Sequence, residues 1–93
     1  MVVGTLRLSL LLRGSHSLKD KRRVVRGLKD RIRARFNVSI AEVDSQGSHQ
    51  RAEIGIAMVS NDSVYVTTVL DKLVDLVRLV RGAELLDYEV EIL

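Results

Sequence analysis

The amino-acid sequence predicts an α+β fold of the ferredoxin-like βαββαβ type, in which a four-stranded antiparallel sheet of order 4-1-3-2 carries two helices on one face. Three observations lead to this prediction. Four segments show the alternation or β-branched content of strands, and two repeat apolar residues at helical spacing. The two kinds of segment follow one another as strand, helix, strand, strand, helix and strand. Right-handed crossovers favour this topology strongly. The 93 residues contain no linker, so we expect residues 1–93 to form a single ferredoxin-like domain.

The first strand and the first helix occupy the N-terminal part of the chain. Alternating apolar residues predict a half-buried strand over residues 2–12, and Gly14 ends it. Ser17 stands three positions before Asp20, a spacing typical of helix N-termini, so we expect a helix to begin near Leu18. The apolar stripe of this helix comprises Leu18, Val25, Leu28, Ile32 and Phe36.

The two middle strands are expected to form a hairpin. Residues 37–44 are rich in β-branched side chains, and residues 45–50 make a polar loop. Residues 51–60 alternate again, so that one face of the third strand presents Ile54, Ile56 and Met58.

The second helix and the last strand complete the pattern. Residues 60–62 are all favourable N-cap types, and Gly82 is expected just beyond the end of the helix. The helix carries an apolar stripe of Val66, Val69, Leu70, Leu73, Val77 and Val80. The last strand covers residues 84–93, and because Tyr88 shares parity with its apolar residues we expect Tyr88 in the core.

The composition bounds the class of protein. Apolar residues make up 46% of the chain, which is typical of a folded globule. Cysteine is absent, which excludes a disulfide framework and thiolate chemistry. The start of the chain has neither a basic signal-peptide region nor the roughly 20 apolar residues of a membrane span. We therefore expect a soluble, cytoplasmic protein that does not contact a membrane.

Charge is distributed unevenly along the chain. Residues 17–36 carry nine of the fifteen Lys and Arg residues and two acidic residues, a net charge of +7, whereas the remainder carries −4. At about 100° per residue, six of the basic side chains fall within an arc of roughly 120° on one flank of the predicted helix. These six residues define the basic ridge: Lys19, Arg22, Arg23, Arg26, Lys29 and Arg33.

Two interpretations of the basic ridge compete. One is a surface that contacts the phosphates of RNA or of another polyanion. The other is a solvated helix face, since Lys and Arg are common in helices. A solvated face ordinarily mixes both signs of charge, and the ridge is expected not to, which favours phosphate contact. The hypothesis assigns this contact first to Lys19, Arg22, Arg26, Lys29 and Arg33.

The predicted topology brings further basic residues to one end of the sheet. The loop after the first strand, the hairpin loop and the loop before the last strand all lie there. We therefore expect this end to gather Arg13, His16, Lys19, Lys21, His49, Arg51 and Arg81. The N-terminus of the first helix adds free N–H groups and the positive end of its dipole. Arg13 and Arg51 join the ridge as candidate RNA-binding residues.

The outward face of the sheet is expected to be acidic. Its positions are Thr5, Arg7, Ser9, Glu53, Gly55, Ala57, Asp87, Glu89 and Glu91. Without aromatic side chains this face does not stack bases as RNA-recognition motifs do, so RNA is expected on the helices and loops. Arg7 is expected to pair with Glu53 or Glu89 across the strands.

Chemistry-bearing motifs are scarce in this sequence. His16 and His49 supply only two metal ligands without a third, and we expect both to be exposed polar residues. We find no Gly-rich phosphate loop and no defensible nucleophile, base and acid grouping. We therefore expect no catalytic residue, no metal and no cofactor.

Four motifs carry a resemblance to a known family. They are "SLKDKRRVV" on the first helix, "FNVSIAEVD" leading into the second strand, "VSND" before the second helix and "DYEVEIL" at the end. Together they resemble the YlxP-like family of small bacterial proteins, a domain of unknown function. The resemblance implies a ferredoxin-like fold and no established site residues. Genes of the family often lie beside those for translation initiation factor 2 and ribosome-binding factor A, which implies a role near the ribosome or RNA.

Three classes of function remain open at this point. The leading hypothesis is a non-enzymatic module that binds RNA or the ribosome through its basic first helix. The alternative is a structural or regulatory protein-interaction module, either monomer or homodimer, whose basic helix meets an acidic protein. Leu76 and Leu79 are expected to pack on the first helix or to form a dimer contact. The third is an enzyme with a small-molecule site. Gly27 and Ala34 leave a small flat spot on the first helix where another backbone can approach.

Overall fold

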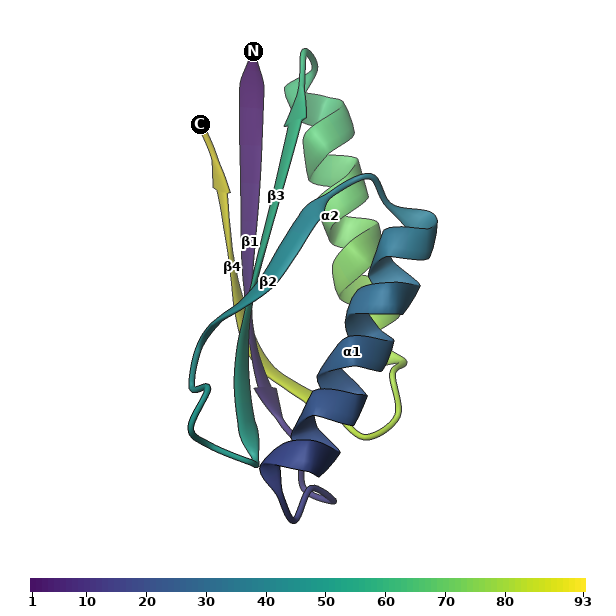
Figure 1. Ribbon diagram of the computed structural model, residues 1–93. Coiled ribbons are helices and arrows are strands. Elements are labelled where there is room, and N and C mark those ends of the chain that lie inside the picture. The colour runs from purple at the N-terminus through teal and green to yellow at the C-terminus, as the bar shows by residue number, and fades with distance from the viewer.

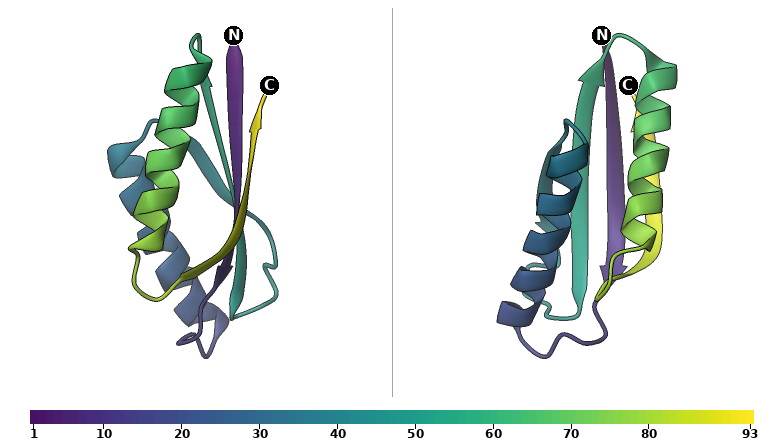
Figure 2. Two further views of the ribbon diagram at one scale, coloured as in Figure 1. Left: turned by 180° about the vertical axis from the view of Figure 1, so that it is seen from behind. Right: turned by 90° about the vertical axis from the view of Figure 1, so that its right-hand side faces the viewer.

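The computed structural model describes residues 1–93 and confirms the predicted order of elements. The strands and helices are β1 (Val2–Leu11), α1 (Leu18–Arg35), β2 (Ser39–Asp44), β3 (Arg51–Ser60), α2 (Ser63–Arg78) and β4 (Glu84–Ile92), as Figure 1 shows. All strand pairs are antiparallel, in the order β2-β3-β1-β4, which is the predicted order read from the other edge. Both helices cover the same face of the sheet (Figure 2). The chain therefore has an α+β ferredoxin-like fold.

Element boundaries differ from the predicted ones where the chain turns. Phe36 is the C-cap of α1, and its N–H donates to Ile32 O at 2.8 Å, so β2 begins later than residue 37. Helix α2 ends at Arg78, and its C-cap N–H donates to carbonyls of the last turn. Val80, expected on the stripe of α2, therefore lies beyond the helix. Gly82 has φ +88° and makes the turn into β4, a backbone angle that favours glycine.

The core lies between the sheet and the inner faces of the two helices. The alternate leucines of β1 and the alternate isoleucines of β3 are buried as predicted, and Val25, Leu28 and Ile32 of α1 pack over them. Leu18, expected on the same stripe, is exposed at the first turn of α1. From α2 the buried residues are Val66, Leu70, Leu73, Val74, Leu76 and Val77.

The expected core position of Tyr88 is wrong. Tyr88 pairs with Leu8, and Val90 pairs with Leu6, so both side chains point to the helix side as their parity predicts. Both nevertheless stay about two-fifths exposed, at 41% and 40%. β4 is an edge strand, and α2 covers it only in part. The guanidinium of Arg78 instead lies 5.8 Å from the centre of the Tyr88 ring, a cation–π contact.

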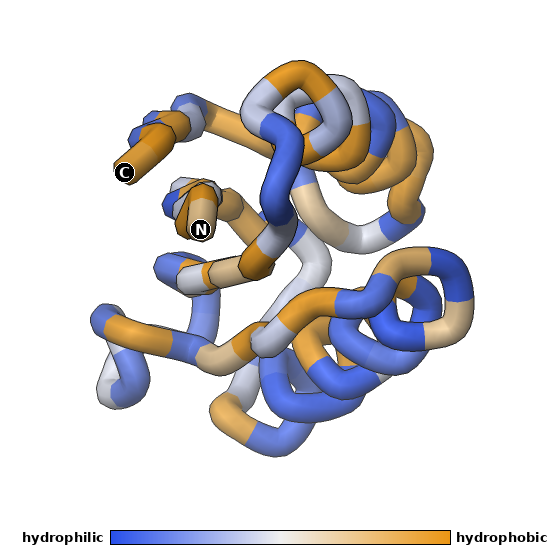
Figure 3. Tube along the Cα trace, turned by 90° about the horizontal axis from the view of Figure 1, so that it is seen from above, coloured by the Kyte–Doolittle hydropathy of each residue, from blue (hydrophilic) through white to orange (hydrophobic).

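The two helices differ in character along their whole length. Seen from above, the trace of α1 is mainly hydrophilic, whereas that of α2 carries more hydrophobic residues (Figure 3). Four residues of α1 and six of α2 are buried. Neither helix combines the length and apolarity needed to cross a membrane. α1 presents more charged side chains to solvent than α2 does.

Candidate nucleic-acid interface

The N-terminus of α1 is capped in part by its own side chains. Ser17 is the N-cap and accepts a hydrogen bond from Asp20 N–H at 3.1 Å, while the Asp20 carboxylate accepts one from His16 N–H at 3.0 Å. The predicted N-cap role of Ser17 is confirmed, whereas the Asp20 carboxylate binds the N–H of His16 and not that of Ser17, as a full capping box requires. The expectation of a freely available anion site at this end needs correction, because the Asp20 carboxylate already lies against the first turn. Basic side chains are therefore better placed than this helix end to contact phosphates.

Lys21 does not belong to the exposed basic residues at this end of the sheet. Its side chain is 2% exposed, and its ammonium donates to Ser45 O at 2.7 Å and to Arg51 O at 3.1 Å. The ammonium also forms an ion pair of 2.7 Å with Glu42 Oε2. This oxygen is buried and accepts no hydrogen bond, so the ion pair is its only polar contact. Lys21 ties α1 to the β2–β3 hairpin and is unavailable to a ligand.

Four residues of the basic ridge form one compact surface on the N-terminal half of α1. They are separated by three, four and seven positions, which places them on one side of the helix. They line a surface hollow of about 460 Å³ that contains no apolar residue, and none of them forms an ion pair. We call this set the N-terminal basic cluster: Lys19, Arg22, Arg23 and Arg26.

The C-terminal half of the ridge is less suited to phosphates. Lys29 is half-buried, and Arg33 donates to Ile40 O at 3.3 Å, which ties it to β2. Asp30 follows Arg26 by four positions and falls within the same arc of the helix. The expectation that this flank carries a single sign of charge is therefore wrong for its second half.

The loops at the lower end of the sheet meet as predicted. Leu12 N–H donates to Gln50 O at 2.8 Å, which joins the end of β1 to the hairpin (Figure 1). Arg13 pairs with Glu84 at 2.9 Å, so its charge is partly neutralised, whereas Arg51 remains exposed and unpaired. His16 and His49 are exposed. Nowhere do three or more His, Cys, Asp or Glu side chains group closely enough to hold a metal ion.

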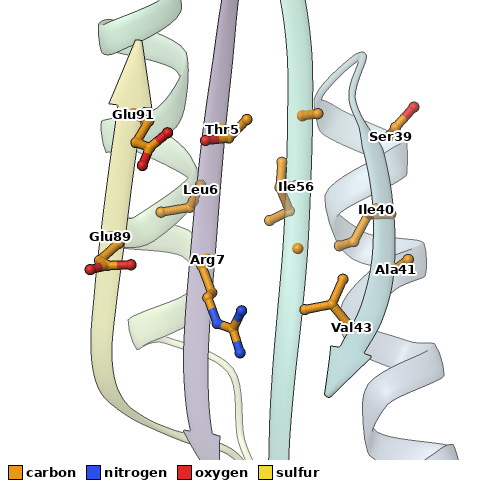
Figure 4. Close-up of a pocket in the computed structure, with 12 residues that line it drawn as sticks. Thr5, Leu6, Arg7, Ser39, Ile40, Ala41, Val43, Ile56, Glu89 and Glu91 are labelled. Carbon is orange, nitrogen blue, oxygen red and sulfur yellow. The ribbon is translucent and has the colours of Figure 1, made fainter. Parts of the chain in front are cut away.

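The open face of the sheet carries the opposite charge. A hollow of about 550 Å³ lies on this face. Figure 4 shows Glu89 and Glu91 of β4 along one side of it. Arg7 is the basic residue in this hollow, and it pairs with Glu53 at 3.3 Å and with Asp44 at 3.6 Å. Of the two predicted partners, Glu53 and Glu89, Arg7 therefore pairs with Glu53. Neither Glu89 nor Glu91 forms an ion pair, so this face repels phosphates.

Sequence reasoning missed a second hollow, which lies between the helices. It has a volume of about 560 Å³, and it is lined by Arg23, Val24, Gly27, Leu28, Arg31, Leu79, Val80 and Arg81. We call it the interhelical groove. The only feature of the sequence that indicated open space here was Gly27, a glycine in the middle of a helix. The groove shares Arg23 with the N-terminal basic cluster.

The fold and its two faces define a small ferredoxin-like protein with a basic first helix and an acidic open sheet. Residues 3–90 match the family described as "Protein of unknown function (DUF503)". The chain is 34% identical over 71 residues to "Uncharacterized protein YlxP" of Bacillus subtilis (strain 168), an alignment that covers 76% of this chain and 77% of that protein. The chain belongs to the DUF503 family, and the resemblance read from the four motifs is confirmed.

Proposed function

We propose that this protein is a non-enzymatic module that binds RNA through the first helix, with the ribosome as its expected context. The observation that carries the proposal is the N-terminal basic cluster, four basic side chains on one side of α1 without an ion pair. The open face of the sheet carries Glu89 and Glu91, which form no ion pair, so the two faces of the molecule differ in charge. A polyanion is drawn to α1 and repelled from the sheet.

Binding through this cluster reads the RNA backbone more than its sequence. Lys and Arg side chains on phosphates release counterions, so the affinity falls as salt rises. Four contacts at about 0.7 each give a slope of about −2.8 for log affinity against log salt on single-stranded RNA. Arg51 and Lys29 lie outside the cluster and are expected to modulate this slope only slightly.

Charge reversal tests the proposal. We expect Arg22→Glu combined with Arg26→Glu to weaken binding to all single-stranded RNA sequences alike and to bring the slope to about −1.4, since two contacts remain. Fluorescence anisotropy over a series of salt concentrations measures both quantities. Stability should change by no more than about 0.5 kcal/mol, because both positions are exposed.

A matched control separates the cluster from net charge. Arg35→Glu combined with Lys72→Glu makes the same change of net charge at exposed positions outside the cluster. This control should keep most of the affinity and the slope. If both double variants bind RNA equally well, the ridge is a solvated helix face and the proposal is wrong. A melting temperature raised by a metabolite would instead favour the enzyme hypothesis.

One observation favours a second candidate, a protein-interaction module. Tyr88, Val90 and Ile92 are each about two-fifths exposed along β4, whose outer edge pairs with no strand. A free edge with apolar side chains is a template for strand addition by another chain. Sedimentation velocity tests this candidate: a dimer that Val90→Lys converts to a monomer supports it, and a monomeric wild-type protein argues against self-association.

A further inference from the structure

The interhelical groove has an apolar floor that nothing covers. Leu79 is 79% exposed, and Val24 and Val80 are half-buried beside it. A Cβ atom added to Gly27 would meet no atom within 4 Å, so the backbone of α1 is open to the groove at this turn. The volume of about 560 Å³ lies within the range of small-ligand sites in proteins.

The rim of the groove is basic. Arg23 and Arg31 come from α1, and Arg81 comes from the turn that follows α2. All three side chains are exposed, and none forms an ion pair. The planar guanidinium group both stacks on flat rings and binds phosphate. This arrangement suits a ligand in which a flat ring is joined to a negatively charged group. The ring would lie on the apolar floor, and the charged group would meet the three arginines.

Arg23 also connects the groove to the N-terminal basic cluster, because it lines both hollows. A chain of phosphates on the cluster would therefore reach the mouth of the groove. We propose that the groove accepts an unpaired base of RNA whose neighbouring phosphates lie on the N-terminal basic cluster. This inference rests on the proposed function and specifies its ligand as single-stranded or looped RNA, because bases inside a duplex stay paired and stacked.

The test compares ligands that share phosphates but differ in free bases. The probes are a single-stranded RNA, a duplex RNA of equal length and inorganic polyphosphate of equal phosphate number. The wild-type protein should bind single-stranded RNA at least about five-fold more tightly than polyphosphate, the lower end of what one stacked base contributes. Competition for a labelled single-stranded RNA measures all three affinities.

Gly27→Gln fills the groove without changing the charge. It should lower the affinity for single-stranded RNA to the level of polyphosphate and leave the affinities for polyphosphate and duplex RNA unchanged. Ala34→Gln is the matched control, since it adds the same side chain at an exposed position of α1 outside the groove. This control should keep the preference of the wild-type protein.

The outcomes separate the inference from the proposed function. If single-stranded RNA and polyphosphate bind equally tightly to the wild-type protein, or if Gly27→Gln keeps the preference, the groove holds no base and only the inference fails. If neither polyanion binds with a salt-dependent affinity, the proposed function itself fails. A third outcome is that an acidic amphipathic peptide binds the wild-type protein more tightly than RNA does and loses this affinity in Gly27→Gln. That outcome assigns the groove to a protein partner and overturns the inference.

Discussion

At the scale of single residues, Lys21 has a different role from its basic neighbours in α1. Lys19 and Arg22 on either side are exposed, whereas the ammonium of Lys21 contacts two hairpin carbonyls and Glu42. The helical spacing explains why Lys21 is buried. Lys21 precedes Val25 by four positions and Leu28 by seven, so it lies on the apolar stripe of the helix. The net charge of residues 17–36 does not distinguish this buried lysine from its exposed basic neighbours. The buried partners come from the distant residues 42–51 and were not predictable from local sequence.

The first prediction concerns this buried ammonium. Lys21→Met keeps most of the unbranched side chain but removes the ammonium, which leaves a buried carboxylate oxygen of Glu42 and two carbonyls without their partner. We expect the free energy of unfolding to fall by roughly 3 kcal/mol, measured by urea denaturation. Adding Glu42→Leu should recover part of the loss, because the stranded charge is then removed. A single variant as stable as the wild-type protein would show that Lys21 is not a structural tie.

At the scale of elements, two glycines lie in opposite surroundings, one in a helix and one in a strand. Gly27 lies within α1 with open space around it, whereas Gly4 lies on β1 directly beneath α2. A Cβ atom at Gly4 would overlap Val66 Cγ1 and approach Leu70 Cδ1 to 3.3 Å. Gly4 therefore permits the close contact of α2 with the sheet. Sequence reasoning singled out Gly27 and passed over Gly4, because local sequence does not indicate which glycine has a close neighbour in the fold.

The second prediction is that Gly27→Ala stabilises the protein. The added methyl group meets no atom within 4 Å, and alanine favours a helix interior by about 1 kcal/mol over glycine. The free energy of unfolding should rise by roughly this amount in urea denaturation. No change, or a loss, would mean that the helix is distorted at this turn. A gain in stability would also support a functional reason for glycine at this position.

The third prediction is that Gly4→Ala destabilises the protein. Overpacking against a buried neighbour typically costs about 1–3 kcal/mol, because Val66 and Leu70 must shift in a filled core. Thermal unfolding should show a lower melting temperature than the wild-type protein. The same substitution thus has opposite signs at the two glycines. An unchanged melting temperature would show that α2 moves away from β1 at little cost.

At the scale of the whole molecule, the two sides of the sheet carry opposite charge. Periodicity was sufficient to predict the fold, because every strand and helix buries one face and the topology rules leave few arrangements. It also predicted the acidic open face. The exposure of Tyr88 and the interhelical groove escaped prediction, since both depend on how far α2 extends over its neighbours. That extent is set by packing between distant elements and not by local pattern.

The last prediction tests which side of the molecule meets RNA. The chain has no cysteine, so a single cysteine can be introduced as a clean probe. Ala41 is exposed on the open sheet face (Figure 4), where it pairs with Gly55. Gly27 is exposed on α1. Saturating single-stranded RNA should slow alkylation of Gly27→Cys several-fold and leave Ala41→Cys unchanged, because Glu89 and Glu91 repel phosphates from the sheet. Added salt should remove the protection as the complex dissociates. Protection of Ala41→Cys with free reaction of Gly27→Cys would place the RNA on the sheet and contradict the proposed interface.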